Sequence, residues 1–522
     1  MDKLVIVSML LVIAFVLPLE SYRILGVFPF HSRSHQMLFD GIAKGLARKG
    51  HQVDFITFNP MKKPVPNYKV VVNLQNMTES LVNKWNITFA NQLGSDTLPN
   101  TAFFCGNDLC EYLAMPEMQK FIKNPPKDPP YDLVIVESLG ANCFVGFGHL
   151  LKVPVVMASS TIDMPWLDEA LGQPDNTAFF PAFFTGYSHP MTFLERVQNT
   201  ITSHMNHYRF RYYTDGVQNA LMKKYFGPDI PPLWELEKNV VLALVNSFHS
   251  LSGVRPITHG IIEVGGLHVF ENYVELPQEL EKWLNESRAG VVYFTLGSMV
   301  NIETFPEETL KAFYSTFRKI APVRVLMKIA NKENLLPGLP DNVRISSWIP
   351  QTAVLEHKNT KVFITHGGLM STQEALTFGV PMIGMPLFGD QFSNIALYTK
   401  RNMALRLDMK NITEESIYEA LHEVLTNPKY KKFADYHSKL FLDRPMSAMD
   451  TAIYWIEYAI RNGPGTLKSP AVDLTWWQVA LLDVYTFLAL SFIFVCYIIF
   501  MIIKICFKTL TLKNSHQRQK QD

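Results

Sequence analysis

Residues 348–391 contain the pattern that most restricts how this chain can fold. The short β-branched and aromatic run VFIT is followed by the turn His366-Gly367-Gly368 and then by LMSTQEALTF, whose apolar residues recur at helical spacing. The pattern predicts a strand, a tight glycine turn and a helix in direct succession. A helix that begins after such a turn presents unpaired backbone N–H groups and the positive end of its dipole, which favour a phosphate. The glycines let the backbone approach that group closely.

Strand and helix patterns alternate along most of the chain. The N-terminal half has candidate strands in ILGVFPF, HQVDFITF, YDLVIVES and VPVVMAS, with helical spacing between them. A second set follows the glycine-bearing stretch VRPITHGIIEVGGLHV, with candidate strands VVYFTLGS, VRVLMKIA, VRISSWIP, VFITHGG and PMIGMPLF. Such alternation is typical of parallel α/β sheets. Because 522 residues suffice for two domains of ~150 residues or more, we predict two, spanning 22–262 and 263–475.

Both ends of the chain have the composition of membrane-targeting segments. Residues 1–21 read as a secretory signal peptide, with Lys3 before a long apolar run. Residues 479–503 are predicted to form a transmembrane helix, since 484–503 carry no charge and suffice to cross a bilayer. The basic tail, 504–522, predicts a cytosolic C-terminus and a lumenal body, a single-pass type I topology.

The tail also carries a candidate localisation signal. Arg518 and Lys520 stand where endoplasmic reticulum membrane proteins have a dibasic retrieval signal. Sequons that fit a lumenal body occur at Asn76, Asn86, Asn285 and Asn411.

The five cysteines do not form a disulfide scaffold. Cys105 and Cys110 could pair in an oxidising lumen, with Cys143 buried and free, but the sequence leaves the pairing open. The net charge of +1 gives no reason to expect nucleic acid as a partner. The lipid bilayer is the partner that the ends predict, and the oligomeric state, a homo-oligomer included, stays open. Metal-ligand spacing and a DxD triplet are both absent from the sequence, so no metal is expected.

The segment 348–391 resembles the signature of the UDP-glycosyltransferase family. Each residue alone has a commoner structural explanation, and it is their joint spacing that carries the resemblance. The matching positions are Trp348, Gln351, His366, Gly367, Gly368, Glu374, Pro381, Pro386, Asp390 and Gln391. The resemblance implies the GT-B fold, in which two doubly wound domains face one another across a cleft, and a UDP-sugar donor.

The resemblance also implies a role for each of these polar residues. Trp348 would stack on uracil, Gln351 would hold the base, and Glu374 would accept from the ribose hydroxyls. His366 and the turn through Gly368 would grip the pyrophosphate, and the Gly297-Ser298 pair would add donors to it. Asp390 and Gln391 would bond the hydroxyls of the sugar. Many relatives have Asn where this chain has Met370, so a β-phosphate contact there would come from Ser371 or from the backbone.

Transfer of a sugar to a hydroxyl needs a base and stabilisation of the departing diphosphate. His35 is the candidate base, because it follows the first strand at the edge where open α/β sheets bind ligands, and relatives have their catalytic histidine at this Ser-His pair. His31 ranks second. Relatives orient the histidine with a carboxylate, for which Glu137 is preferred, while Asn142 occupies the position where some members have Asp.

Residues 161–235 are rich in aromatics and methionine, which is typical of a helical core or of an apolar acceptor pocket. The helix predicted in MSAMDTAIYWIEYAIRN would return to pack on the first domain, as it does in relatives. Together these features predict inverting transfer of a hexose, with glucose expected, from a UDP-sugar to a small lipophilic acceptor. The alternatives are a transferase dedicated to a lipid or ecdysteroid-like hormone, and a catalytically impaired member that binds apolar ligands.

Overall fold

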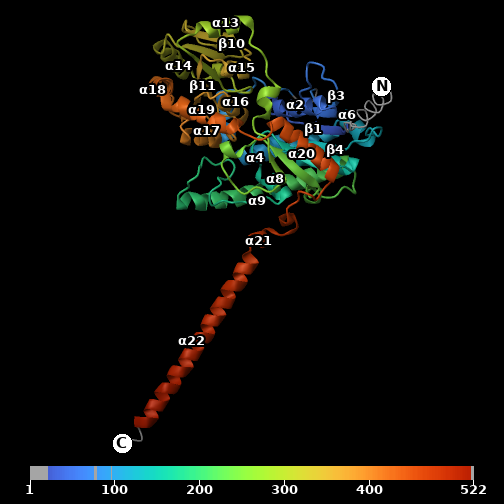
Figure 1. Ribbon diagram of the computed structural model, residues 1–522, viewed down its shortest axis with the longest axis vertical. Helices are drawn as coiled ribbons and strands as arrows, with labels where there is room; N and C mark the ends of the chain where they lie inside the picture. Colours follow the sequence, from blue (N-terminus) through green and yellow to red (C-terminus); the bar gives the residue numbers. More distant parts are fainter. Residues whose placement is uncertain (1–20, 76–78, 96, 519–522) are drawn as a thin grey trace, which may run out of the picture. The chain divides into compact units, whose positions relative to one another are not determined.

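The computed structural model describes residues 21–75, 79–95 and 97–518 (Figure 1). It forms two compact units, one that ends at Lys468 and one that begins at Ser469. The signal peptide expected at residues 1–21 falls almost wholly outside the described residues, as do Asn76 and Lys520. In the sequons at Asn86, Asn285 and Asn411 the asparagine side chain is exposed. Their glycosylation stays a prediction.

The first unit contains two parallel sheets. The N-terminal sheet has seven strands in the order β3-β2-β1-β4-β5-β6-β7. Its central strands are buried on both faces, as continuous apolar runs in a parallel sheet require. The strands are β1 (Arg23–Phe28), β2 (Gln52–Thr57), β3 (Tyr68–Asn73), β4 (Leu133–Glu137), β5 (Val155–Ser159), β6 (Val240–Val245) and β7 (Ile261–Glu263).

Helices from the first half of the chain connect these strands; with the N-terminal sheet they are called the N-lobe. Two apolar cores form, one on each face of the sheet. The helices are α2 (Arg33–Arg48), α3 (Ile87–Ser95), α4 (Thr97–Ala102), α5 (Asp108–Cys110), α6 (Pro116–Lys123), α7 (Gly146–Leu151), α8 (Pro165–Leu171), α9 (Phe193–Tyr225), α10 (Leu233–Glu237), α11 (His249–Ser252) and α12 (Leu267–Glu271).

The C-terminal sheet has six parallel strands in the order β10-β9-β8-β11-β12-β13. The strands are β8 (Val291–Thr295), β9 (Arg324–Lys328), β10 (Val343–Ser346), β11 (Thr360–Thr365), β12 (Met382–Gly384) and β13 (Ala404–Arg406). With its helices it is called the C-lobe. These are α13 (Gln278–Glu286), α14 (Glu307–Lys319), α15 (Gln351–Glu356), α16 (Leu369–Thr377), α17 (Gln391–Lys400), α18 (Glu414–Thr426) and α19 (Pro428–Leu442).

Both sheets confirm the doubly wound architecture expected from the sequence. In each, the chain winds outward in one direction, returns to the centre and winds outward in the other. The order reverses between β1 and β4 in the first sheet and between β8 and β11 in the second. Such switch points leave a crevice at the carboxyl ends of the strands, where ligands bind. Strands β3, β6, β7 and β13 were not anticipated from the sequence.

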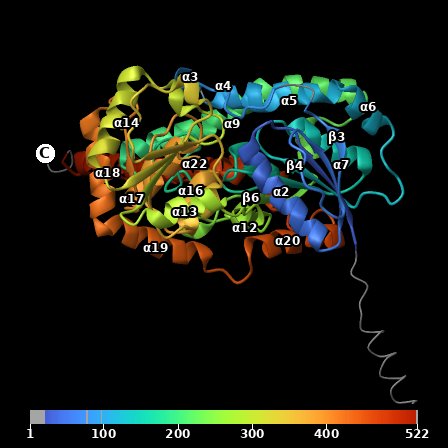
Figure 2. The ribbon, with the colours of Figure 1, turned by 90° about the horizontal axis from the view of Figure 1, so that it is seen from above.

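The two lobes exchange segments. In the 83–95 stretch, the N–H of Asn83 donates to Ser298 at 2.8 Å and that of Trp85 donates to Met299 at 3.0 Å. Helix α3 then adds Ile87 to the C-lobe core, and Figure 2 shows it beside α14.

In return, α20 (Ala448–Asn462) packs on the N-lobe. Its buried residues recur every three or four positions, as on the apolar face of a helix. This agrees with the return expected of that helix.

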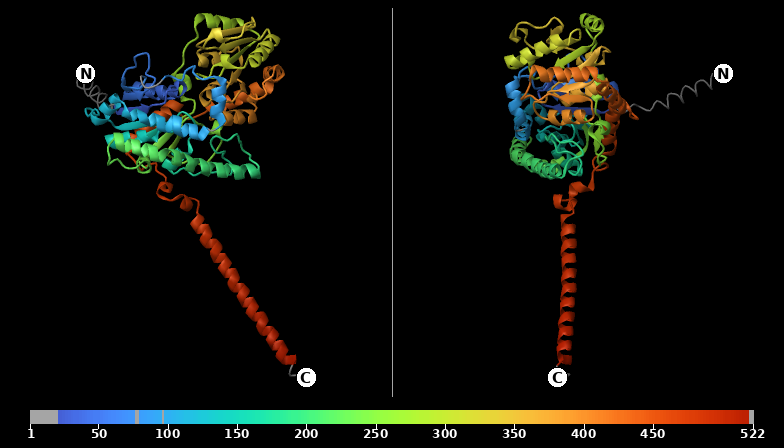
Figure 3. Two further views of the ribbon diagram at one scale, coloured as in Figure 1. Left: turned by 180° about the vertical axis from the view of Figure 1, so that it is seen from behind. Right: turned by 90° about the vertical axis from the view of Figure 1, so that its left-hand side faces the viewer.

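The second unit contains α21 (Trp476–Val479) and α22 (Leu482–Arg518). Within α22, residues 482–511 are long and apolar enough to cross a membrane, and their most apolar 18-residue stretch has a mean hydropathy of 2.7. Figure 3 shows α22 as one continuous helix. The helix thus extends well beyond residue 503, where the sequence predicted the span to end.

The sequence left the pairing of Cys105 with Cys110 open, and the structure does not form it. Cys110 bonds Cys143, with the Cα atoms 6.2 Å apart, and Cys105 is a free thiol. Residues 103–110 form one helical run, π-helical to Asn107 and then α-helical. Both cysteines are therefore held in one helical run, and only Cys110 meets a partner, Cys143.

Candidate active site

A cavity of about 210 Å³ lies where the switch points of the two sheets meet. The N-lobe contributes residues that follow β1 and β5, among them His35 and Ser160. The C-lobe contributes residues that follow β8, β9 and β11. Every residue that the sequence predicted for the donor lines this cavity, namely Gly297, Ser298, Trp348, Gln351, His366, Gly368, Ser371, Glu374, Asp390 and Gln391.

His35 lies in the first turn of α2, directly after β1. Its Nδ1 atom is 3.2 Å from Oε1 of Glu137 and 2.7 Å from Oγ of Ser160. A carboxylate only accepts, so a neutral ring that bonds Glu137 carries its hydrogen on Nδ1. Nε2 is then unprotonated and able to take a proton. Glu137 ends β4, so the pair spans the switch point of the N-terminal sheet.

Asn142 lies elsewhere. Its Nδ2 donates to Oε1 of Glu237 at 2.6 Å, and the other oxygen of Glu237 pairs with Arg211 at 2.7 Å. This buried group does not contact His35. Of the two partners that the sequence left open, the structure therefore brings only Glu137 to the histidine.

His31 is buried and does not line the cavity. Its ring contacts Phe104 edge-on and lies near Phe58. Burial lowers its pKa to about 4. It has the environment of a core side chain.

His366 directly follows β11 and fills the space between two glycines. A Cβ atom at Gly297 would lie 2.7 Å from the His366 ring, and one at Gly368 would lie 2.8 Å from it. Gly297 also has a φ of 83°, in the left-handed region. Burial, and secondarily the charge of Lys328, lower the pKa of His366 to about 4. At neutral pH the ring is therefore an uncharged hydrogen-bonding group.

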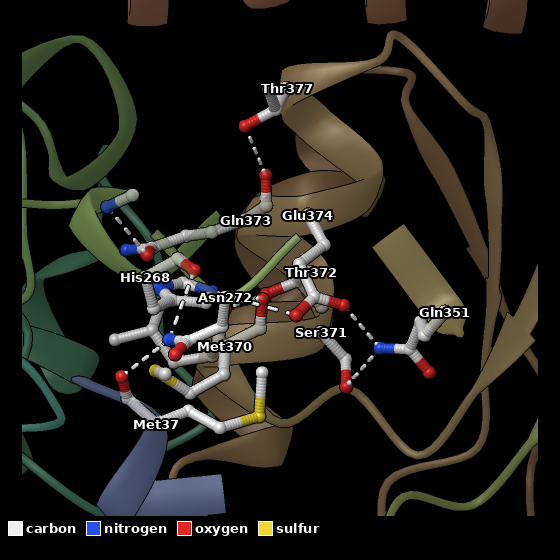
Figure 4. A network of polar contacts seen from close by, with 12 residues as sticks. Met37, His268, Asn272, Gln351, Met370, Ser371, Thr372, Gln373, Glu374 and Thr377 are labelled. Carbon is white, nitrogen blue, oxygen red and sulfur yellow. Dashed lines mark hydrogen bonds and ion pairs between the residues drawn. The ribbon is translucent and has the colours of Figure 1, made fainter. Parts of the chain in front are cut away.

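Gln351 and Glu374 are bonded to each other on the far wall of the cavity (Figure 4). The amide Nε2 of Gln351 donates to Glu374 at 2.5 Å and to the hydroxyl of Ser371 at 3.1 Å. Burial raises the pKa of Glu374 to about 7, an effect that the bond from Gln351 opposes.

Met370 points away from this group. Its sulfur accepts from Nδ2 of Asn246, and its carbonyl lies 3.2 Å from Nε2 of His268, both of which belong to the N-lobe. The residue that departs from the family pattern therefore joins the lobes.

Two side chains at the cavity are open to a ligand. The ring of Trp348 is 65% exposed at the mouth. The hydroxyl of Ser298 is buried and has no hydrogen-bond partner among the described residues.

Asp390 and Gln391 begin α17. Nδ2 of Asn394 donates to Asp390 at 2.8 Å. Burial raises the pKa of Asp390, and the bond from Asn394 opposes that shift. The side-chain oxygen Oε1 of Gln391 accepts from the backbone N–H groups of Leu387 and Phe388, at 2.8 and 3.1 Å. Its oxygen is thus occupied, and only its NH₂ group can serve a ligand, which narrows the donor-and-acceptor role expected of it.

Sequence reasoning missed Lys328 and Ser160. Lys328 ends β9, and its ammonium donates to Oδ1 of Asn83 at 2.9 Å and to the carbonyl of Gly297 at 2.7 Å. Burial lowers its pKa to about 8, an effect that the charge of Glu303 opposes. Both residues stand at the carboxyl end of a buried strand beside a switch point, a position that would have identified them.

A second, apolar cavity of about 130 Å³ adjoins the first. The two share His35, Asp390 and Phe388. The walls of the second are mainly aromatic and aliphatic side chains, including Phe30, Trp85, Phe104, Phe183 and Phe184. No group of His, Cys, Asp and Glu that could hold a metal ion occurs in the described part of the chain.

Comparisons with known proteins match this arrangement. A family model described as "UDP-glucoronosyl and UDP-glucosyl transferase" matches residues 27–517. UDP-glucosyltransferase 2 of Dactylopius coccus is 36% identical, over 91% of this chain and 92% of that protein. UDP-glucuronosyltransferase 2C1 of Oryctolagus cuniculus is 33% identical, over 76% and 78%. The crystal structure of glycosyltransferase VinC, with 18% identity, aligns with a TM-score of 0.57 over 84% of this chain and all of VinC.

Two facing doubly wound sheets of this kind define the GT-B glycosyltransferase fold. The chain belongs to the UDP-glycosyltransferase family, whose members transfer a sugar from a UDP-sugar to an acceptor.

The contact between Asn142 and Glu237 generates a prediction. Asn142→Asp sets a second carboxylate against a buried one, so we expect roughly 2–4 kcal/mol of lost stability at neutral pH. The new carboxyl would have a raised pKa in the folded protein, so the loss should be absent in acid and grow as pH rises. Thermal unfolding at several pH values measures it. Asn142→Ala is the control, with a smaller loss at alkaline pH, because it removes the hydrogen bond to Glu237 without adding a charge. Equal stability of Asn142→Asp and the native chain at alkaline pH would contradict this account.

Proposed function

We propose that this protein transfers glucose from UDP-glucose, with inversion, to a hydroxyl of a small lipophilic acceptor. The observation that carries the proposal is the position of His35, held by Glu137 at a cavity whose opposite wall has the residues expected for the donor. The same histidine borders the apolar cavity. It can therefore bond an acceptor hydroxyl that lies next to the anomeric carbon of a donor.

The donor would lie across the C-lobe switch point. Trp348 stacks on the uracil ring, and Glu374 accepts from the ribose hydroxyls. The pyrophosphate lies at the turn after β11, where His366 and the N–H groups that begin α16 can donate. Ser298, whose hydroxyl has no partner among the described residues, lines the same cavity. Asp390 and the NH₂ group of Gln391 bond the hexose.

Lys328 supplies the positive charge for the diphosphate. It is a half-buried cation whose two hydrogen-bond partners are neutral, so a bound diphosphate would add negative charge to that of Glu303. As the bond to the sugar breaks, negative charge grows on the leaving phosphate, and a fixed ammonium stabilises it.

Catalysis follows from the orientation of His35. Nε2 takes the proton of the acceptor hydroxyl as its oxygen attacks the anomeric carbon, and UDP departs from the opposite face. Glu137, at Nδ1, holds the ring in the required tautomer and stabilises the imidazolium that forms. A single displacement inverts the anomeric centre, so the α-linked donor yields a β-glucoside.

The acceptor and the subcellular location are part of the same proposal. The aromatic cavity suits a small apolar molecule with one hydroxyl placed near His35. The protein is an endoplasmic reticulum membrane protein of type I topology, with the first unit in the lumen. This rests on the N-terminal apolar run, the candidate span in α22 and the basic tail.

Product analysis tests the proposed reaction directly. The full chain, with UDP-glucose and a panel of phenols, should give β-glucosides, whose anomeric configuration is read by NMR. UDP-glucuronate serves as the comparison donor and should react more slowly. An α-glucoside would contradict inversion, and binding of phenols without turnover would favour the catalytically impaired alternative.

Calorimetric titration separates the base site from the sugar site. Trp348→Ala should weaken UDP and UDP-glucose equally, by about 1–3 kcal/mol, because both ligands carry the base. Asp390→Ala should spare UDP and weaken UDP-glucose alone, because UDP has no hexose. Equal weakening of both ligands by Asp390→Ala would remove that residue from the sugar site.

The affinity for UDP-glucose should have an optimum between pH values of about 7 and 8, set by Glu374 and Lys328. Below the pKa of Glu374 the carboxyl is protonated and accepts poorly from ribose. Above the pKa of Lys328 the ammonium loses its charge and attracts the diphosphate less. UDP-glucose itself has no group that titrates in this range.

Matched variants assign the two limbs of that pH profile, measured by calorimetry. Glu374→Gln should abolish the fall on the acid side, and Lys328→Arg should abolish the fall on the alkaline side, because a guanidinium stays charged. If both variants keep the native profile, neither residue has the role proposed for it.

A further inference from the structure

Helix α9 buries polar side chains along much of its length. Its buried positions include the polar residues Asn199, Ser203, Asn206, Thr214 and Gln218. These amides bond the chain beneath: Nδ2 of Asn199 donates to the carbonyls of Thr177 and Phe180, and Nε2 of Gln218 donates to that of Gly140. An ordinary surface helix directs its apolar face inward and its polar face to water.

The outward face of α9 carries a row of exposed apolar side chains. Six of them form a stripe, each between 40% and 74% exposed. At ~100° per residue the six fall within about 80° of the helix circumference, and at ~1.5 Å per residue the stripe is about 27 Å long. The stripe consists of Leu194, Val197, Ile201, Met205, Tyr208 and Tyr212. Figure 1 shows α9 along one edge of the first unit.

The chain itself keeps this edge near a bilayer. Where the first unit ends, the carbonyl of Leu467 lies close to Gly260, whose other neighbour is Leu171 of α8. Helix α8 packs on α9, with the rings of Trp166 and Phe210 stacked at 3.6 Å. The residues between Lys468 and the candidate span that begins at Leu482 reach at most about 45 Å when fully extended.

The composition of the stripe suits a lipid surface. Two of its six residues are tyrosines, which have an apolar ring and a polar tip and are enriched where bilayer meets water. The exposed Lys223 and Lys224 near the C-terminal end of α9 suit the headgroup layer. We propose that α9 lies in the surface of the bilayer that α22 crosses, with its apolar stripe in the headgroup–acyl boundary.

Docking of α9 on the membrane would affect how acceptors reach the apolar cavity. This step rests on the proposed function. Nδ2 of Asn206 holds the carbonyl of Phe183, and Phe183 lines the apolar cavity beside His35. The loop that walls the acceptor cavity is therefore fixed to a helix on the membrane. Lipophilic acceptors dissolved in the bilayer are then presented next to the cavity that receives them.

Photoreactive lipids test the docking without any measurement of turnover. The full chain is placed in phosphatidylcholine nanodiscs, at a loading that gives one copy per disc. One lipid carries a diazirine near the glycerol and the other carries it at the end of the acyl chain. Peptide mass spectrometry should find α9 adducts with the shallow probe, because interfacial helices lie only about 5–10 Å deep. α22 should react with both probes.

Matched substitutions complete the test. Ile201→Asp with Tyr208→Asp should reduce α9 adducts to background, leave α22 adducts unchanged and leave the thermal unfolding temperature unchanged, since both side chains are already exposed. Phe270→Asp, at an equally exposed apolar residue on α12, should change nothing. Adducts on α22 alone in the native chain would overturn the proposal. So would cross-links between the α9 helices of two copies in detergent, which would assign the stripe to a second copy.

Discussion

The structure depends on the exchange of segments between its two lobes. The N–H groups of Asn83 and Trp85 bond the strand-like stretch after β8, and α20 crosses back to cover the first sheet. These two crossings hold the switch points of the sheets against each other. Only in that arrangement does a histidine of the N-lobe border the same cavity as Asp390 of the C-lobe. Without the exchange, each lobe would present half a site.

Burial then sets the electrostatics of that cavity. It raises the pKa of Glu374, lowers that of Lys328 and keeps His366 neutral. Water is withdrawn from these groups before any ligand arrives, so each of them interacts more strongly with a ligand of the right polarity. The proposed function places the ribose hydroxyls of a UDP-sugar at Glu374 and its diphosphate at Lys328, which is the order of these groups along the ligand.

The sequence predicted the elements whose signals are local. The strand–turn–helix through His366, the position of His35 after the first strand and the donor residues at family spacing all follow from short windows. Features that depend on distant contacts could not be read in this way. Cys110 pairs with Cys143 because two helical segments meet, Asn142 is distinguished from Glu137 only by which side chain reaches His35, and the exposed stripe of α9 looks like a core pattern until the fold shows that it faces outward.

The central claim is that His35 removes the acceptor proton, and single-turnover glucosyl transfer at saturating UDP-glucose tests it most directly. His35→Ala should lower the rate by about 10²–10⁴, the contribution of general base catalysis, and leave the affinity for UDP-glucose nearly intact. His31→Gln, a change to the neighbouring buried ring, should keep a rate close to that of the native chain. A native rate in His35→Ala would contradict the account.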